Sequence, residues 1–348
     1  MRAAVLEAIG RLAVKDVPSP RVTPGSVCLR VMACGVCGSD LRILRYGHAR
    51  VKPPAILGHE IAGVVVEVGS GAPLRVGQRV AITPRISCGK CWYCTHDKYT
   101  YCPTGRSFGY AIPGGLAEYV LIPPEGIRMG VVNTFESPLS YEEAALAEPL
   151  ACCLHGQRQS RLSRGDVVAI IGAGSIGLLH ALLAVAQGAA TCILIERNPA
   201  RVAMAAPLAP GPVVDSSRSD PLPAVLEASG GRGADVVIVA ASATPAQEQA
   251  LRLAGKGGRV NFFGGLPSGT PPISLDSNRV HYDEVSIQGS HGSTPEENRR
   301  ALELLQSGAV AVKRLITHRF SLEDVEKAIV ATESKEGLKV VVIPQEGA

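Results

Sequence analysis

The stretch VVAIIGAGSIG, residues 167–177, decides the fold of the central part of the chain. A short apolar run ends at Gly172, and an apolar stretch of helical composition follows Gly177. Gly172, Gly174 and Gly177 therefore form a G-x-G-x-x-G pattern between a predicted strand and a predicted helix, which is the context that gives the pattern meaning. The first glycine permits a tight turn, the second lets a pyrophosphate approach the backbone, and the third lets the helix pack on the strand. The stretch predicts a dinucleotide-binding loop, whose helix N-terminus offers N–H groups to phosphates.

A carboxylate follows at the distance that this type of loop requires. Glu196 ends the second predicted strand, TCILIE, residues 191–196. A carboxylate there accepts hydrogen bonds from the ribose hydroxyls and repels a 2′-phosphate, so the sequence favours NAD over NADP. The neighbouring Arg197 offers the opposite reading, because its guanidinium is able to meet a 2′-phosphate.

The pattern of apolar and turn-forming residues differs between this region and the segments on either side of it. Residues 148–289 alternate apolar strands with Ala-rich helices, which predicts an α/β domain with a parallel sheet. Residues 1–147 consist of short β-branched runs separated by Gly, Pro and Ser, which predicts a β-rich domain. In the tail, residues 290–348, we expect helices over 294–308 and 321–334 and a strand over 338–344, with Thr294 as N-cap and Pro295 at the first helical position.

Composition excludes several classes of protein. The 348 residues carry 35 Lys and Arg against 31 Asp and Glu, a net charge of +4 without a run of like charge, which argues against a nucleic-acid or membrane-surface partner. No apolar stretch approaches the roughly 20 residues of a membrane span, and the N-terminus lacks the features of a signal peptide. We therefore expect a two-domain cytoplasmic protein that acts on small molecules.

Four cysteines within one short segment predict a metal site. Cys88, Cys91, Cys94 and Cys102 have the spacing C-x2-C-x2-C-x7-C. Four thiolates surround Zn²⁺ tetrahedrally and leave no position for substrate, so the expected role is structural. An iron–sulfur cluster is the rival interpretation, and four unliganded buried thiols are the third.

A second, open metal set is spread along the chain. Cys37, His59 and one or both of Glu60 and Glu148 supply a thiolate, an imidazole and carboxylates, which suits a zinc ion that keeps a position for water or substrate. Zinc in such a site acts as a Lewis acid toward a hydroxyl group.

Two further residues lie next to Cys37 in the same segment. Asp40 is expected to orient His59 through its second ring nitrogen, and Ser39 is expected to pass a proton toward solvent. The alternative for Ser39 is that it merely caps the following helix.

The order of these segments resembles the zinc-containing medium-chain dehydrogenase/reductase family over nearly the whole chain. The segments are GVCGSD (35–40), GHEIAGVVVEVG (58–69), the cysteine quartet, GGLAEYV (114–120), EPLA (148–151) and GAGSIG (172–177). The resemblance implies a GroES-like β-rich catalytic domain built from residues 1–147 and 290–348. It also implies a doubly wound Rossmann NAD-binding domain over residues 148–289. Within the family the chain is similar to the branch of sorbitol (L-iditol), threonine and galactitol-phosphate dehydrogenases.

The resemblance also implies roles for individual residues. It implies that Cys37, His59 and Glu148 bind the catalytic zinc, with Glu60 as an exchangeable fourth ligand. Ser39, Glu60 and Glu148 are then the expected catalytic residues. It implies cofactor contacts from Ser175, Ile176, Glu196, Arg201, Gly264 and Leu266, in addition to the glycines of the loop.

Departures from the family pattern concern the substrate. Arg42 stands where many relatives have the histidine of a proton relay, and Arg85 stands where threonine dehydrogenases have a histidine. His291 lies near the position of an arginine that binds the polyol in sorbitol enzymes. Arg42, Phe108 and His291 are therefore expected to line the substrate pocket.

These observations predict a dehydrogenase with two zinc ions per chain. The expected reaction transfers a hydride between NAD and a secondary alcohol of a polyol, cyclitol or sugar, in a homodimer or homotetramer. The alternatives are an L-threonine 3-dehydrogenase, a phosphorylated-polyol dehydrogenase and, in a different class, a zinc-stabilised dinucleotide sensor without turnover.

Overall fold

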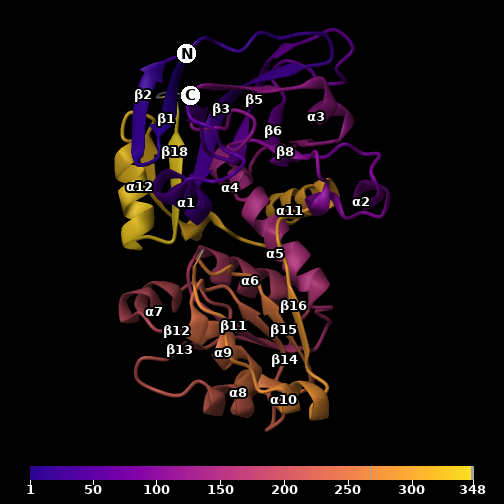
Figure 1. The fold of residues 1–348 in the computed structure, drawn as a ribbon, viewed down its shortest axis with the longest axis vertical. Helices are drawn as coiled ribbons and strands as arrows, with labels where there is room; N and C mark the ends of the chain where they lie inside the picture. Colours follow the sequence, from indigo (N-terminus) through magenta and orange to yellow (C-terminus); the bar gives the residue numbers. More distant parts are fainter. Residues whose placement is uncertain (268, 346–348) are drawn as a thin grey trace. The chain divides into compact units, whose positions relative to one another are not determined.

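The computed structural model describes residues 1–267 and 269–345 (Figure 1). The chain divides into two compact units, one formed by residues 1–151 and 293–348 and the other by residues 152–292. Both boundaries lie a few residues later than the expected ones. As a result, Glu148 belongs to the first unit, and His291 belongs to the second.

The second unit is built on a six-stranded parallel sheet. Its strands follow the spatial order β13-β12-β11-β14-β15-β16, which is the order 3-2-1-4-5-6 of a doubly wound dinucleotide-binding domain. Every neighbouring pair is parallel, for example β11 with β12, where Ile171 faces Ile195. The strands are β11 (Val167–Ile171), β12 (Thr191–Glu196), β13 (Val213–Asp215), β14 (Ala234–Val239), β15 (Ala254–Phe262) and β16 (Ser286–Gly289).

Helices connect these strands, as the alternation of apolar strands with Ala-rich helices in the sequence predicts. All five residues of β11 are buried, which fits a central strand covered on both faces. The helices of this part are α5 (Ala147–Gln159), which begins in the first unit, α6 (Ser175–Ala186), α7 (Pro199–Ala205), α8 (Leu222–Ala228), α9 (Thr244–Leu253) and α10 (Ser277–Tyr282).

The first unit is β-rich, and its largest sheet combines both ends of the chain. In this sheet β18 (Lys339–Ile343) pairs antiparallel with β3 (Val27–Val36) and parallel with β17 (Ile316–Ser321). Figure 1 shows β18 in yellow beside β3 in indigo. The other strands of this sheet are β5 (Glu60–Val68), β6 (Arg79–Ile82), β9 (Tyr119–Ile122) and β10 (Val132–Thr134). The tail of the chain thus completes the first domain, as the resemblance implies.

The remaining described strands of this unit form two smaller sheets. One has the order β2-β1-β4, formed by β1 (Arg2–Ala8), β2 (Arg11–Asp16) and β4 (Ala55–Ile56). The other pairs β7 (Arg85–Ile86) with β8 (Arg106–Ser107). The helices are α1 (Gly38–Tyr46), α2 (Trp92–Thr95), α3 (Pro124–Arg128), α4 (Tyr141–Ala145), α11 (Pro295–Gln306) and α12 (Val325–Ser334).

The two helices of the tail differ in how well the sequence predicts them. Thr294 caps α11 and Pro295 is its first residue, as expected: the Thr294 hydroxyl accepts the Glu297 N–H at 3.1 Å. Residues 321–324, expected to be helical, do not belong to α12: Ser321 ends β17, and the Asp324 N–H donates to the Ser321 hydroxyl at 3.3 Å. This local hydrogen bond competes with helical pairing, which delays the helix start. No helix among the described residues is long and apolar enough to cross a membrane.

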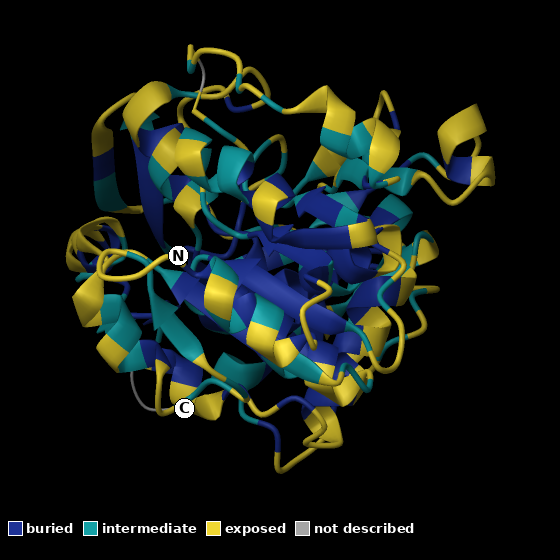
Figure 2. Cartoon of the chain, turned by 90° about the horizontal axis from the view of Figure 1, so that it is seen from below, coloured by how far each residue is buried: buried dark blue, intermediate teal, exposed yellow. Residues whose placement is uncertain are grey.

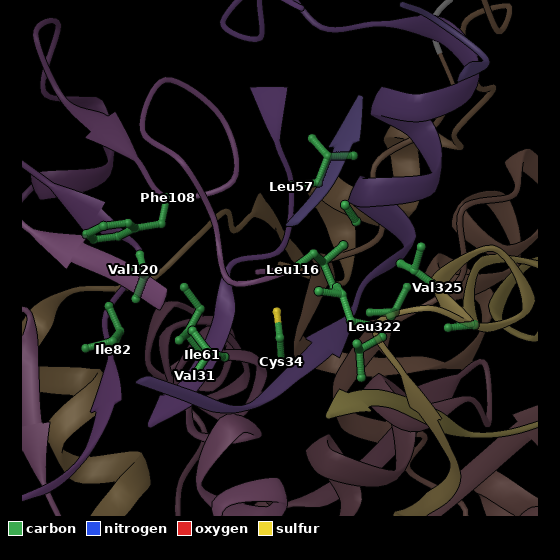
Figure 3. Packing of buried hydrophobic residues seen from close by; sticks show 14 of the residues in the cluster. Val31, Cys34, Leu57, Ile61, Ile82, Phe108, Leu116, Val120, Leu322 and Val325 are labelled. Carbon is green, nitrogen blue, oxygen red and sulfur yellow. The ribbon is translucent and has the colours of Figure 1, made fainter. Parts of the chain in front are cut away.

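Buried residues concentrate in the strands, and exposed ones on loops and outer helix faces (Figure 2). In the first unit the core includes Phe108, which is fully buried. Figure 3 shows the Phe108 ring beside Val120, with Ile82 close by in the same cluster. The expectation that Phe108 lines the substrate pocket is therefore wrong, because its ring has no exposed surface to offer a ligand.

Candidate metal centres and cofactor-binding loop

The first candidate centre begins where β3 gives way to α1. Cys37 occupies the N-cap of α1, and the Asp40 carboxylate accepts the Cys37 N–H at 3.0 Å, which closes a capping box. This arrangement fixes the Cys37 side chain at the helix start. Ser39 lies inside the first turn and not at the cap, so the interpretation of Ser39 as the capping residue is wrong.

Asp40 also lies beside His59. The Asp40 Oδ1 atom lies 3.5 Å from His59 Nδ1 and accepts the Gly58 N–H at 3.2 Å. Burial lowers the pKa of His59, but the Asp40 carboxylate and the Cys37 thiol raise it well above its ordinary value. With Nδ1 directed at Asp40, the Nε2 atom is left for a metal ion. The Ser39 hydroxyl lies 3.5 Å from this Nε2 atom.

Cys37, His59 and Glu60 form a group that fits a metal ion. One ligand atom from each of the three lies within 4.8 Å of the others, and His59 and Glu60 are buried. Sulfur, imidazole nitrogen and carboxylate oxygen are the donors that zinc prefers. Glu148, on α5, is buried as well, and its charge helps to raise the pKa of Lys339, which lies beside Glu60. The assignment of Glu148 as the third ligand stays a prediction.

Lys339 is a charged residue of this centre that the sequence analysis missed. Its Nζ atom donates to Glu60 Oε1 at 2.6 Å and to the Val36 carbonyl at 3.2 Å, and it also contacts Glu60 Oε2. Burial lowers the pKa of Lys339, but Glu60 and the neighbouring anionic groups raise it above its ordinary value, so the ammonium stays charged. The only sequence signal is a single Lys at the start of the apolar strand KVVVI.

The sequence analysis also missed Tyr110, whose aromatic ring lies next to His59. The centroid of the Tyr110 ring lies 5.8 Å from that of His59 and 5.2 Å from that of His48. Burial is the main cause that raises the pKa of Tyr110. Arg42, expected to contact substrate, is an exposed residue of α1 whose charge acts on His48.

The cysteine quartet forms the second candidate centre. The sulfur atoms of Cys88 and Cys94 are 3.9 Å apart, and those of Cys91 and Cys94 are 3.5 Å apart. A tetrahedron with metal–sulfur distances of about 2.3 Å places its sulfurs about 3.8 Å apart, so the quartet fits one zinc ion. The Cys91 N–H also points to the Cys88 sulfur at 3.3 Å, a bond that stabilises a thiolate.

Arg85 secures the lobe that carries the quartet. Its guanidinium donates to the Cys102 carbonyl at 2.8 Å and to the Tyr99 carbonyl at 3.1 Å. Burial and the charge of Arg50 lower the pKa of Arg85 below its ordinary value, and Cys102 and Cys94 oppose this shift only in part. At the position where threonine dehydrogenases have a histidine, this chain therefore has a residue that contacts the lobe around the cysteines.

In the second unit the glycine loop has the predicted conformation. Gly172 has φ +108°, which an L side chain rarely adopts, and α6 begins at Ser175, directly after Gly174. A Cβ atom at Gly177 would collide with the Gly172 carbonyl oxygen, which explains the need for the third glycine.

Glu196 is fixed at the end of β12, next to this loop. Its carboxylate accepts N–H groups from Ala173 at 3.0 Å, Arg197 at 2.8 Å and Asn198 at 2.9 Å. Arg201 approaches Gly174: a Cβ atom there would lie 2.9 Å from the Arg201 Nη1 atom. Burial lowers the pKa of Arg201, and the charge of Glu196 raises it.

The remaining expected cofactor residues lie at the same edge of the sheet or in the loop beyond it. Gly264 follows β15, and its N–H donates to the Val239 carbonyl at the end of β14 at 2.7 Å. Leu266 is half-buried in the loop that follows, and Ile176 lies in the first turn of α6. His291 is exposed in the segment after β16. Carboxyl ends of parallel strands form the ligand-binding edge in such domains.

Comparisons with known proteins agree with both halves of this description. Residues 23–129 match the family described as alcohol dehydrogenase GroES-like domain, and residues 175–307 match the family described as zinc-binding dehydrogenase. A sorbitol dehydrogenase from Halalkalibacterium halodurans is 34% identical over 340 residues, which cover 96% of each chain. An L-threonine 3-dehydrogenase from Bacillus licheniformis is 33% identical over 336 residues, which cover 94% of each chain.

The chain belongs to the zinc-containing medium-chain alcohol dehydrogenase family. A solved structure agrees: a zinc-binding dehydrogenase from Sinorhizobium meliloti bound to NADP has a TM-score of 0.91 and 36% identity, with 99% of each chain covered. The predicted fold class, a GroES-like β-rich domain with a Rossmann domain, is confirmed. As a member of this family the chain is a zinc-dependent alcohol dehydrogenase that uses a nicotinamide dinucleotide and acts on small molecules.

Proposed function

We propose that this dehydrogenase oxidises a secondary alcohol of a polyol, cyclitol or sugar with NAD as the hydride acceptor. The observation that carries the proposal is the group of Cys37, His59 and Glu60, a mixed set of sulfur, nitrogen and oxygen ligands with Asp40 beside His59 and Lys339 bonded to Glu60. Bound zinc supplies a Lewis acid that increases the acidity of the substrate hydroxyl, and bound NAD accepts the hydride.

Individual residues are proposed to bind the metal ion, to orient a ligand and to transfer the proton. Cys37, His59 and Glu148 are proposed to hold the metal ion, with Glu60 as an exchangeable ligand. Asp40 keeps the His59 ring in one orientation, because it faces Nδ1 at 3.5 Å. Ser39 is proposed to receive the proton that leaves the substrate hydroxyl, which its distance of 3.5 Å from His59 Nε2 supports.

The preference for NAD rests on Glu196. Three backbone N–H groups hold its carboxylate beside the glycine loop, so that a negative charge stands at the expected ribose position. A 2′-phosphate would meet this charge at short range, which is unfavourable. Arg197 and Arg201 are the groups through which NADP would compete.

The test is a spectrophotometric survey of the purified protein. With NAD and a panel of polyols, cyclitols and 2-amino-3-hydroxy acids, we expect NADH absorbance with at least one of the first two groups. His59→Ala should abolish it and release one of two zinc ions, whereas His281→Ala, an exposed histidine of α10, serves as the matched control. Turnover of threonine alone would instead establish the threonine 3-dehydrogenase alternative.

Two further expectations belong to this proposal. The non-enzymatic alternative, a dinucleotide sensor, is disfavoured because Cys37, His59 and Glu148 are all present. A homodimer or homotetramer is expected, and light scattering of the purified protein distinguishes the two.

A further inference from the structure

A buried glutamine of α9 contacts the loop that leaves the sheet of the second unit at its carboxyl edge. The Gln247 side chain is buried, and its Nε2 atom donates to the Gly264 carbonyl at 3.1 Å. Gly264 is one of the expected cofactor residues. The neighbouring Glu248 carboxylate accepts the Ser274 N–H at 2.9 Å, so two consecutive residues of α9 bond to the segment that follows β15.

The position of Gly264 explains why a side-chain donor is needed there. Pairing of β15 with both neighbours ends at Phe262, which lies opposite Val239 on β14 and Gly289 on β16. The Gly264 N–H still reaches the Val239 carbonyl at 2.7 Å, but the Gly264 carbonyl lies beyond the last paired residue. A backbone carbonyl that leaves a ladder needs another partner, and the Gln247 amide supplies it.

The backbone at Gly264 is also confined on the side of β14. A Cβ atom at Gly264 would lie 2.7 Å from the Ala241 carbonyl oxygen, which is closer than a side chain allows. This contact limits movement of the loop toward β14, and the bond from Gln247 fixes the orientation of the carbonyl. Since an amide buried without a partner is unfavourable, the bond to Gly264 accounts for a glutamine at this buried position.

The strand order indicates which half of a dinucleotide this loop serves. A sheet of the order 3-2-1-4-5-6 consists of two mononucleotide-binding halves, which meet where the order reverses, here between β11 and β14. Glu196 ends a strand of the first half, and Gly264 follows a strand of the second half. Because a carboxylate in the position of Glu196 bonds the adenosine ribose, the half that contains Gly264 is left for the nicotinamide mononucleotide.

We propose that Gln247 is a positioning residue for the nicotinamide half of the cofactor. Its amide holds the Gly264 carbonyl and so keeps the start of the loop in one conformation before the cofactor arrives. Binding then does not have to order this part of the backbone, which favours affinity. The role concerns the dinucleotide that members of this family use, so it is the same for any alcohol substrate.

The experiment is a fluorescence titration of the zinc-loaded full-length protein with NADH, together with displacement of NADH by AMP. AMP carries the adenosine half alone and therefore reports on the first half of the sheet. In Gln247→Met we expect NADH to bind roughly threefold to tenfold more weakly, the effect of one neutral hydrogen bond, and AMP to bind as in wild type. Gln249→Met is the matched control, because Gln249 lies two positions further along α9 on a different face, and it should bind both nucleotides like wild type.

Three results would overturn the inference. They are an affinity of Gln247→Met for NADH that equals that of wild type, an equal weakening of NADH and AMP, and an equal loss in Gln249→Met. The second result would indicate a general loss of structure, and the third a disturbance of α9. Should Gln247→Met not fold, Gln247→Leu, which suits both a helix and a buried position, gives the same comparison. Binding of NADH requires no alcohol, so failure of the proposed function, seen as absence of turnover with every polyol and cyclitol, is distinguishable from failure of this inference.

Discussion

Replacement of Lys339 by methionine tests the ion pair that lies under the candidate catalytic centre. Lys339 is 5% exposed and Glu60 is 1% exposed, so the variant would leave a carboxylate buried beside an apolar side chain. Breaking a buried pair by removal of one partner costs about 3–5 kcal/mol. For a folding unit of this size each kcal/mol lowers Tm by about 2–4 °C, which predicts a decrease of about 6–20 °C.

The assay is thermal unfolding at saturating zinc, so that metal release does not contribute to differences between variants. Glu60→Gln combined with Lys339→Met removes both charges and should recover at least half of the lost Tm. Lys327→Met is the matched control, because Lys327 is 72% exposed and pairs with Asp324 at the surface, where such pairs contribute little. A Tm of Lys339→Met that equals that of the control, or a double variant no more stable than the single one, would refute the reasoning.

Four further predictions concern the metal ions, the cofactor and the proton path. A chelator should remove the catalytic zinc ion before the zinc ion of the cysteine quartet, because the quartet is closed and its metal contributes to folding. Activity should then be lost while the fold persists. Metal analysis that finds one zinc ion per active chain would contradict this. Glu196→Ser should raise the efficiency with NADP relative to NAD about tenfold or more, and a wild type that prefers NADP would contradict the role given to this carboxylate. Cys37→Ala should lose zinc and turnover together, whereas Ser39→Ala should retain both zinc ions and slow turnover by about 10²–10⁴-fold; unchanged turnover per folded molecule would remove Ser39 from the proton path. Arg85→Met loses two hydrogen bonds to carbonyls of the quartet lobe, so zinc release from the quartet to a colorimetric chelator should accelerate, while equal release from wild type and variant would assign Arg85 no such role.

Features confined to short segments were predictable from the sequence. The quartet lies within one segment and the glycine loop within another, so the local chain dictates most of their geometry. The strand β11, the turn at Gly172 and the helix α6 occur where the stretch VVAIIGAGSIG predicts them, because tight turns and helix packing impose the glycines directly. The capping pair of Thr294 and Glu297 is local in the same sense.

Features that join distant segments needed the tertiary structure. Lys339 and Glu60 are 279 positions apart, and the pairing of β18 with β3 brings Lys339 next to the metal set. A phenylalanine occurs both in substrate pockets and in hydrophobic cores, so the sequence does not decide between them for Phe108. Its packing against Val120 in the structure assigns it to the core.

The same limit applies to the two arginines of α1. Arg42 and Arg45 lie one turn apart on α1, and the sequence does not distinguish them; Glu333, from the far end of the chain, neutralises one and leaves the other. Patterns in sequence report what each segment forms by itself, through turns, caps and closely spaced ligands. Sheet register and side-chain packing decide which charges meet, because those contacts depend on segments that are remote in the chain.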